Sequence, residues 1–429
     1  MNRIPPTQRI NCPLRLLFLT AELPEPAHAG GTLRTNGLLR AAHAAGHEVH
    51  LLAFATRDQL NAQRNRLAAY CARVETVSPP QRRLADRLRD LLLTNKADMQ
   101  GRCYSAHYQH ALAKLLEQTP YDLIQIESLE MTIYAPVVRR VQPDTPLLYD
   151  SFNAEADLQR SIFEAERGRL ARLPGALYSF IQWRRLARYE RRVVREATHT
   201  IAVSDADAEA FRRLAPGCPV SVVPNGIDVA HYAVADTSLD LGPAPLVFTG
   251  SMGYRPNVDA ALWFANRVLD RVRAHVPEAR FFIVGSHPHR RLNSLRDRDG
   301  VQITGWVPDV NPFLSAAAVY VVPLRMGSGT RLKLLQAMAA RRAVVSTRVG
   351  AQGLDVQDGV QLRLADTEET FARAVIELLR DPAQRTALGE RAAEYVARNY
   401  DWSVIAPRLL AVYDEVLGTA SAAERSNAR

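Results

Sequence analysis

The chain has 429 residues, of which 47% are hydrophobic, and it carries a formal net charge of +9. This length is too great for a single hydrophobic core and predicts two domains of about 200 residues each. The four cysteines are scattered without metal-ligand or redox spacing, which indicates reduced thiols in a cytosolic protein rather than a disulfide framework.

The apolar run near the N-terminus, residues 14–20, is short and leads into "AELPEP", so we interpret it as a first strand and not as a signal peptide. No segment approaches the ~20 apolar residues that span a bilayer. The sequence therefore predicts a cytoplasmic protein that does not cross a membrane.

Short apolar runs alternate with helix-length amphipathic stretches along the whole chain. Runs that are apolar on both faces are typical of parallel strands covered by helices, and two such series predict an α/β protein with two doubly wound domains. The runs occupy residues 14–20, 47–54, 121–127, 146–151, 198–204 and 220–225 in the first half and 245–250, 280–285, 301–306, 318–323 and 343–350 in the second. A polar stretch without helical periodicity, residues 228–245, separates the two series.

The first candidate binding segment follows the first predicted strand. Gly30 and Gly31 precede a helix, and paired glycines bring a backbone close to a ligand or simply form a turn. Arg34 lies one turn into that helix. The spacing G-x-G-x-x-G is absent, so a nicotinamide fingerprint is not supported.

A second candidate segment, "YDSFNAEADLQRS", follows the strand that ends near residue 151. Asp150, Asn153 and Glu155 occupy its carboxyl end, where doubly wound folds place ligands. For Asp150 and Glu155, capping of the next helix is the equal alternative.

Residues 160–196 contain ten arginines and four glutamates, a net +6 out of the whole chain's +9. Aromatic and aliphatic residues are interleaved with them. Such a segment suits peripheral contact with an anionic membrane face, and it is equally typical of a surface helix pair that packs on the first domain. No recognition motif supports nucleic-acid binding.

Two further glycine segments lie in the second half. "TGSMGYRPN", residues 249–257, follows a strand, and Asn257 is placed to cap the next helix. "MGSGTRLKLLQ", residues 326–336, joins a turn to a helix that Thr330 would start. Arg331 and Lys333 lie in the first turn of this helix, where cations oppose the helix dipole, so an anion bound between them would explain their position. A plain loop with solvated cations is the alternative.

Taken in order, several stretches resemble the family-4 retaining glycosyltransferases of GT-B fold. "FTGSMGYRPNVDAALWF", "FFIVGS", "ITGWVPDV", "YVVPLRMGSGTRLKLLQAMA" and "VVSTRVGAQGL" are similar to the nucleotide-sugar half. "GGTLRTNGLLRAA", "YDLIQIE", "IAVSDADAEAF" and "VVPNGID" are similar to the other half. The resemblance implies an acceptor-side domain over 1–235, a donor domain over 236–399, a helix over 400–420 that crosses back onto the first domain, and a polar tail over 421–429.

The resemblance also implies a reaction and a site. It implies sugar transfer from a nucleotide-diphosphate sugar to a glycan or lipid-linked acceptor in bacterial polysaccharide or glycolipid synthesis, with no cofactor and no metal, because cations and the helix dipole neutralise the leaving group. Arg331 and Lys333 would be catalytic. The implied donor residues are Gly250, Ser251, Trp306, Val307, Gly327, Ser328, Gly329, Thr330, Leu332 and Gln336. The implied acceptor-side residues are Gly30, Gly31, Arg34, Asn153 and Glu155.

The chain departs from the family pattern at three positions. Ser328 and Gln336 stand where many relatives have glutamates, and Phe152 stands where many have histidine. A glutamine oxygen still accepts hydrogen bonds from ribose hydroxyls, whereas phenylalanine offers none. Phe152 and Gln336 keep open the alternative of a nucleotide-sugar-binding protein with little turnover, and a GT-B-like epimerase is a second alternative. "SDAD" resembles a metal motif, but we interpret Asp205 and Asp207 as helix-start residues.

Overall fold

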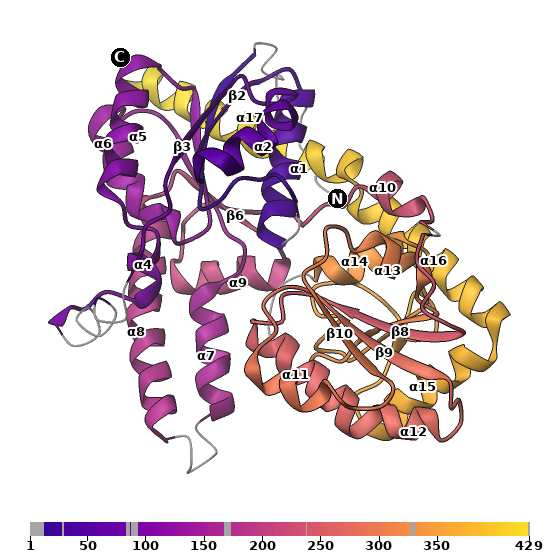
Figure 1. The fold of residues 1–429 in the computed structure, drawn as a ribbon. Helices are drawn as coiled ribbons and strands as arrows, with labels where there is room; N and C mark the ends of the chain where they lie inside the picture. The colour runs from indigo at the N-terminus through magenta and orange to yellow at the C-terminus, as the bar shows by residue number, and fades with distance from the viewer. Residues whose placement is uncertain are drawn as a thin grey trace. The chain divides into compact units, whose positions relative to one another are not determined.

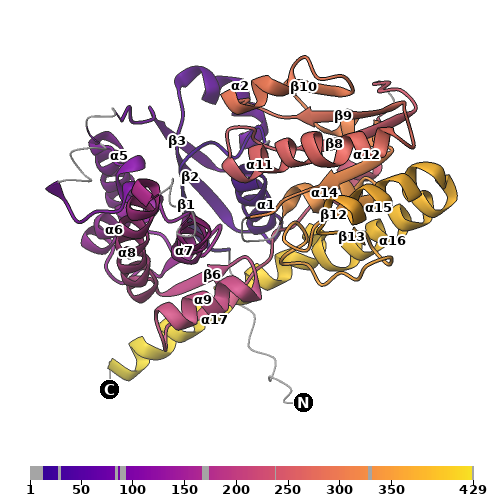
Figure 2. The same ribbon diagram turned by 90° about the horizontal axis from the view of Figure 1, so that it is seen from below.

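The computed structural model divides into two compact units (Figures 1 and 2). The first unit contains residues 1–27, 31–224 and 406–429, and the second contains 28–30 and 225–405. The division falls at Pro224/Asn225, whereas the sequence analysis placed it after residue 235. The structure describes residues 13–27, 30–82, 86, 93–166, 173–236, 238–326 and 331–427.

The first unit is built on a seven-stranded sheet in the order β3-β2-β1-β4-β5-β6-β7, and all neighbouring strands are parallel. Its central strands are buried along almost their whole length because helices cover both faces. The strands are β1 Arg15–Thr20, β2 Glu48–Phe54, β3 Arg73–Val77, β4 Leu123–Glu127, β5 Leu147–Asp150, β6 His199–Ala202 and β7 Val220–Val222.

The second unit has a six-stranded parallel sheet in the order β10-β9-β8-β11-β12-β13. Both units are therefore doubly wound α/β domains, which confirms the predicted fold class. The strands are β8 Ala244–Thr249, β9 Ala279–Val284, β10 Val301–Gly305, β11 Val319–Val322, β12 Val344–Ser346 and β13 Arg363–Leu364.

Helices surround each sheet. In the first unit they are α1 Gly30–Ala44, α2 Arg57–Ala68, α4 Asp98–Arg102, α5 Ala106–Gln118, η1 Met131–Tyr134, α6 Ala135–Val141, α7 Glu155–Glu166, α8 Leu173–Glu196 and α9 Asp205–Leu214. In the second unit they are α10 Val229–Ala233, α11 Arg255–Trp263, η3 Phe264–Val268, α12 Leu269–Arg273, η4 Arg290–Leu295, α13 Asn311–Ala316, α14 Leu332–Ala339, α15 Glu368–Arg380 and α16 Pro382–Tyr400.

The last helix, α17 Trp402–Asn427, starts in the second unit and is counted with the first from Ala406 onward. Its Tyr413 hydroxyl donates a hydrogen bond of 2.7 Å to Gln125 Oε1 of β4. This buried contact ties the helix to the sheet of the first unit.

Two features of the first unit bear on the charged segment. Helices α7 and α8 run side by side and extend away from the sheet as a long pair (Figure 1). Among the residues that the structure describes, no helix is long and apolar enough to cross a membrane.

The helix predicted to start at Asn257 begins two residues earlier, at Arg255. Asn257 is therefore not its cap. The helix also contains a π-helical segment, Phe264–Val268, before it continues as α12. The pattern of apolar residues did not predict this π-helical segment, because Phe264, Ala265 and Val268 are buried as they would be in a regular α-helix.

Candidate functional site

The first turn of α14 carries the two predicted catalytic cations. The helix begins at Leu332, with Arg331 in extended conformation at its N-cap. Among the described residues no side chain caps this end. The Leu334 N–H donates to the Arg331 carbonyl at 2.8 Å, and the N–H groups before it have no acceptor within the helix. The predicted glycine turn, Gly327, Ser328, Gly329 and Thr330, lies outside the described residues. Leu332 itself is buried and anchors the helix start in the core.

Lys333 is held by groups far away in the sequence. Its Nζ donates a hydrogen bond of 2.8 Å to Asn257 Oδ1 of α11. The ammonium also lies 4.5 Å from the ring centroid of Phe248 in β8, within cation–π range. Asn257 Nδ2 in turn donates to the Ser251 carbonyl at 2.9 Å. One asparagine thus connects the lysine to the loop after β8.

That loop contains a glycine that the lysine requires. Gly250 has φ +148, and a Cβ at this position would lie 2.5 Å from Lys333 Nζ and 2.7 Å from Asn257 Nδ2. Gly285, at the end of the neighbouring β9, packs its backbone on Gly250: a Cβ there would lie 1.8 Å from the Gly250 carbonyl oxygen. The structure therefore brings together Gly250, Ser251 and Lys333 as predicted, and it adds Asn257 and Gly285.

The electrostatic state of Lys333 is unusual for a lysine. Burial, together with the positive charge of Arg331, lowers the pKa of Lys333 to about 7. Within the part of the chain that the structure describes, no carboxylate lies within ion-pair distance of this ammonium. A buried cation without a counter-charge is costly, and an anion bound at the helix start would relieve that cost.

Gln336 has a partner that the sequence did not indicate. The side chain is 8% exposed, and its Nε2 donates a hydrogen bond of 2.7 Å to the hydroxyl of Tyr232 in α10. Burial raises the pKa of Tyr232 to about 12, so the phenol stays protonated and retains a proton to donate. The Gln336–Tyr232 pair lies one helical turn after Lys333.

Trp306 and Val307 follow β10 directly. Trp306 is 61% exposed, an unusual state for a large aromatic side chain, and Val307 is half-buried. In a parallel sheet the carboxyl ends of all strands lie on the same side. Trp306 and Val307 therefore lie on the same side of the sheet as Gly250, at the carboxyl ends of the strands. An exposed indole at this edge offers a surface on which a planar base can stack.

In the first unit, Arg34 does not lie at a surface. It is 1% exposed, and its Nε and Nη2 donate to the two Asp150 carboxylate oxygens at 2.7 and 2.5 Å. Its Nη1 donates to the Val223 carbonyl at 3.0 Å. The predicted acceptor-side role of Arg34, and the ligand or capping roles of Asp150, are therefore replaced by a buried bidentate ion pair.

This ion pair belongs to a larger buried network. Glu127, at the end of β4, accepts hydrogen bonds from Thr35 Oγ1 at 3.1 Å and from Gln125 Nε2 at 2.7 Å. Burial first and the negative charge of Asp150 second raise the pKa of Glu127 well above its usual value. Sequence reasoning missed Glu127, because a lone glutamate at a strand end carries no distinguishing pattern.

Gly31 packs against Phe152, the residue that stands where many relatives have histidine. Gly30 and Gly31 are the first two residues of α1 and not a loop before it. A Cβ at Gly31 would lie 2.9 Å from Cε2 of Phe152. The glycine thus allows α1 to pass the Phe152 ring, which gives a packing reason for its position.

Asn153 and Glu155 lie together after β5. Asn153 Nδ2 donates to Glu155 Oε1 at 3.3 Å, and both side chains are half-buried. Burial raises the pKa of Glu155 to about 7, against the opposing effect of the Asn153 hydrogen bond. The backbone N–H groups of Glu155 and Ala156 at the start of α7 donate to the Glu190 carboxylate, each at 2.9 Å. Glu190, and not Glu155, therefore caps this helix.

Asp205 and Asp207 lie in the first turn of α9, as predicted, with Ser204 as its N-cap. Asp207 Oδ1 accepts a hydrogen bond of 3.0 Å from the Ala154 backbone. Among the described residues, no group of three or more His, Cys, Asp or Glu side chains is arranged to hold a metal ion.

Two parallel-sheet domains, one with a cationic helix start at the carboxyl edge of its sheet, define the Rossmann-like architecture of the GT-B fold. Two family models match the chain: "Glycosyl transferase 4-like domain" over residues 29–226 and "Glycosyl transferases group 1" over 244–381. The chain belongs to the family-4 glycosyltransferases.

The chain is also similar to known glycosyltransferases and to solved structures. A phosphatidyl-myo-inositol mannosyltransferase of Mycolicibacterium smegmatis is 33% identical over 230 residues, which cover 51% of this chain and 57% of that protein. The chain thus spans little more than half the length of this relative. Sucrose-phosphate synthase from Thermosynechococcus elongatus superposes with a TM-score of 0.69 at 18% identity, covering 94% of this chain and all of that one. Anabaena HepE in complex with UDP superposes with a TM-score of 0.63 at 15% identity, also over 94% of this chain and 100% of its own. These structures share the fold.

Proposed function

We propose that the protein is a retaining, metal-independent glycosyltransferase that moves a sugar from a nucleotide-diphosphate sugar to a glycan or lipid-linked acceptor. The observation that carries this proposal is the Lys333 ammonium, held by Asn257 in the first turn of α14 and without a carboxylate partner among the described residues. The relatives' names support the substrate classes, since one acts on a phosphatidylinositol and one structure contains UDP.

In the proposed reaction, Arg331 and Lys333 bind the donor diphosphate and stabilise the charge that develops as the glycosidic bond breaks. Two fixed cations and the helix N-terminus supply the compensating charge, so the scheme requires no divalent metal. The departing phosphate takes the acceptor proton on the same face of the sugar, which retains the anomeric configuration. In this scheme Gly250 and Ser251 contact the phosphates, and Trp306 and Val307 contact the base.

The acceptor side of the proposal rests on Asn153 and Glu155. Their amide and carboxyl groups suit hydrogen bonding to sugar hydroxyls, and the raised pKa of Glu155, about 7, leaves it able to accept or donate a proton near neutrality. We place the enzyme in polysaccharide or glycolipid synthesis on the cytoplasmic face of a membrane, with 160–196 as its peripheral contact.

The proposal is tested by measuring transfer. A thermal-shift screen with UDP-, GDP- and ADP-sugars identifies the donor, because a ligand that binds the native state raises its apparent stability. With that donor, NMR of the anomeric proton during turnover should show retention, and chelators should leave the rate unchanged. Tight donor binding without transfer or hydrolysis on any acceptor would favour a binding protein, and interconversion of the donor sugar without an acceptor would favour an epimerase.

Donor affinity should depend on pH through Lys333. The free protein loses this charge above its lowered pKa of about 7, whereas a bound diphosphate stabilises the ammonium and raises that pKa. Affinity is therefore highest below pH 7 and falls by up to about tenfold per pH unit above it, until the pKa of the bound form is reached. Calorimetry at pH 8 in buffers of different ionisation enthalpy should show proton uptake on binding; proton release would contradict this assignment.

The change Gln336→Glu should strengthen nucleotide binding by up to about tenfold, because a carboxylate adds charge assistance to hydrogen bonds from ribose hydroxyls. The Tyr232 hydroxyl would then donate a hydrogen bond to the new carboxylate and hold the carboxylate in place. Calorimetry with the nucleotide diphosphate measures the effect. Gln352→Glu, an exposed change of the same charge in the same unit, is the control. Weaker binding by the Gln336 variant would mean that this side chain does not contact the ribose.

A further inference from the structure

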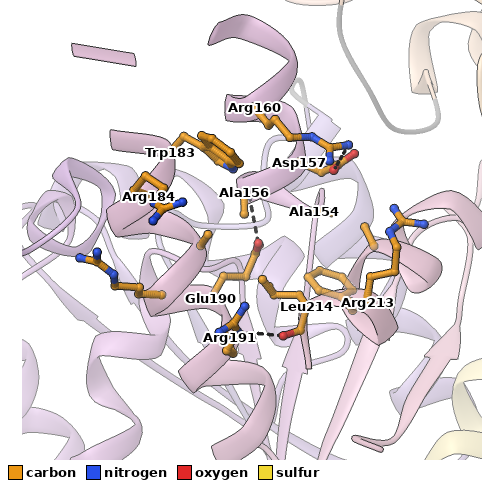
Figure 3. Close-up of a pocket in the computed structure, with 14 residues that line it drawn as sticks. Ala154, Ala156, Asp157, Arg160, Trp183, Arg184, Glu190, Arg191, Arg213 and Leu214 are labelled. Atoms are coloured by element: carbon orange, nitrogen blue, oxygen red, sulfur yellow. Dashed lines mark hydrogen bonds and ion pairs between the residues drawn. The ribbon is translucent and has the colours of Figure 1, made fainter. Parts of the chain in front are cut away.

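A cavity of about 450 Å³ lies between α7, α8 and α9 in the first unit (Figure 3). Its walls come from three helices that are close together in the sequence, and its volume suits a small ligand or a headgroup. The charged groups that line it are Asp157, Arg160, Arg184, Arg188, Glu190, Arg191 and Arg213.

Small side chains create the space. Ala154 and Ala156 line it from the α7 end, and Ala187 and Ala210 line it from α8 and α9. Trp183 forms a wall on the α8 side (Figure 3). Larger residues at the alanine positions would fill the gap between the three helices. The cavity therefore depends on alanines from three helices, and the sequence pattern of one helix alone does not predict it.

The charges around the cavity are unbalanced. Five arginines face two carboxylic acids, a formal excess of three positive charges. Arg160 pairs with Asp157 at 2.8 Å, and Arg213 pairs at 3.6 Å with Glu209, which does not line the cavity. Across the described residues, no carboxylate lies within ion-pair distance of Arg184, Arg188 or Arg191. Arg191 Nε donates to the Leu214 carbonyl at 2.9 Å, which fixes its guanidinium at the cavity wall.

Glu190 does not neutralise these arginines. Both of its oxygens accept backbone N–H groups at the start of α7, as described above, and burial raises the pKa of Glu190 to about 8. Its carboxyl group is therefore committed to the helix end, which leaves the arginines of the cavity without it as a direct partner.

We propose that this cavity is a phosphate-binding site, distinct from the donor site, that takes a phosphomonoester or diphosphate group. Guanidinium groups match tetrahedral phosphate with paired N–H donors, and several around one open cavity favour a compact multiply charged anion. Phosphate binding here does not depend on sugar transfer, because none of these residues has a role in the proposed reaction.

The phosphate can belong to a lipid headgroup or to a free phosphorylated compound. Aromatic side chains adjacent to the cavity favour the lipid. Phe163, Phe180 and Trp183 form a ring cluster, and Tyr178 and Phe180 on α8 are 39% and 37% exposed. Exposed aromatic residues beside arginines are typical of surfaces that contact the membrane interface.

The test compares two double variants of α8 with equal charge loss. Arg184→Ala/Arg188→Ala removes two cavity arginines, and Arg192→Ala/Arg195→Ala removes two exposed arginines of the same helix that do not line the cavity. Inorganic pyrophosphate is titrated by calorimetry in a Lys333→Ala background, so that the donor site does not contribute. Vesicles of phosphatidylcholine, with and without phosphatidic acid, are tested by sedimentation on the full chain.

We expect the cavity variant to bind pyrophosphate at least tenfold more weakly and the control variant less than twofold. A parallel loss of binding to phosphatidic acid vesicles assigns the site to a lipid headgroup; retained vesicle binding assigns it to a free phosphate compound. Equal losses in both variants, or no pyrophosphate binding by the parent protein, would overturn the proposal. Ala187→Phe, which keeps every charge and fills the space, should reproduce the cavity variant, and unchanged pyrophosphate binding by it would also overturn the proposal.

Discussion

Lys333→Ala is expected to lower the rate of sugar transfer by about 100-fold or more, with a parallel loss of donor affinity. The ammonium is fixed by Asn257 and the Phe248 ring in the first turn of α14, so its position is set before the donor arrives. Removing it takes away a pre-organised positive charge, and Lys333 is the one lysine in the sequence of the second unit. Steady-state kinetics with the donor found by thermal shift measure the effect.

The fold should survive this change. A buried ammonium with a lowered pKa is costly to the folded state, so its loss should shift the melting temperature by no more than a few degrees. Lys114→Ala, an exposed change on α5, is the matched control and should leave both rate and stability unaltered. Full activity in a folded Lys333→Ala protein would remove the diphosphate site from the proposal.

The second large effect concerns stability. Arg34→Met should destabilise the first unit by about 3–5 kcal/mol, because it leaves the Asp150 carboxylate buried without its bidentate partner. Methionine keeps much of the side-chain volume, so the loss reports on charge and hydrogen bonding rather than on a cavity. Urea unfolding followed by circular dichroism measures the change, provided that the two units unfold in separable transitions.

A double variant separates the two roles of Arg34. In Arg34→Met/Asp150→Leu both charges are gone, and part of the lost stability should return, because no uncompensated charge remains inside the unit. Arg40→Ala, an exposed change on the same helix, should cost less than about 1 kcal/mol. If Arg34→Met instead kept its stability and lost acceptor saturation, the acceptor-side interpretation would return.

The strands were predictable because each is a short run of apolar residues bounded by turn residues. Each of the eleven predicted runs overlaps a strand of the two parallel sheets. The two strands that were missed have no such run. β3, Arg73–Val77, alternates charged and apolar residues at a half-buried edge of its sheet, and β13, Arg363–Leu364, is only two residues long. Pairing with a neighbour, and not local pattern, makes them strands.

The charge at the start of α14 was also readable from the sequence, since cations in a first helical turn oppose the dipole and need another cause. What holds Lys333 was not readable, because Asn257 lies 76 residues away and is brought close only by the parallel order of the sheet. The same holds for Gln336, whose partner Tyr232 is 104 residues distant.

The sequence by itself determined the two α/β domains, their family and the helix that carries the cations, because apolar periodicity and helix electrostatics are local properties. Only the tertiary structure decided that Arg34 pairs with Asp150, 116 residues away, instead of facing a ligand. It alone also assembled the arginine-lined cavity of α7, α8 and α9. The sequence does not distinguish an arginine that binds a ligand from one that pairs with a buried carboxylate, because the partner is brought close only by the tertiary fold.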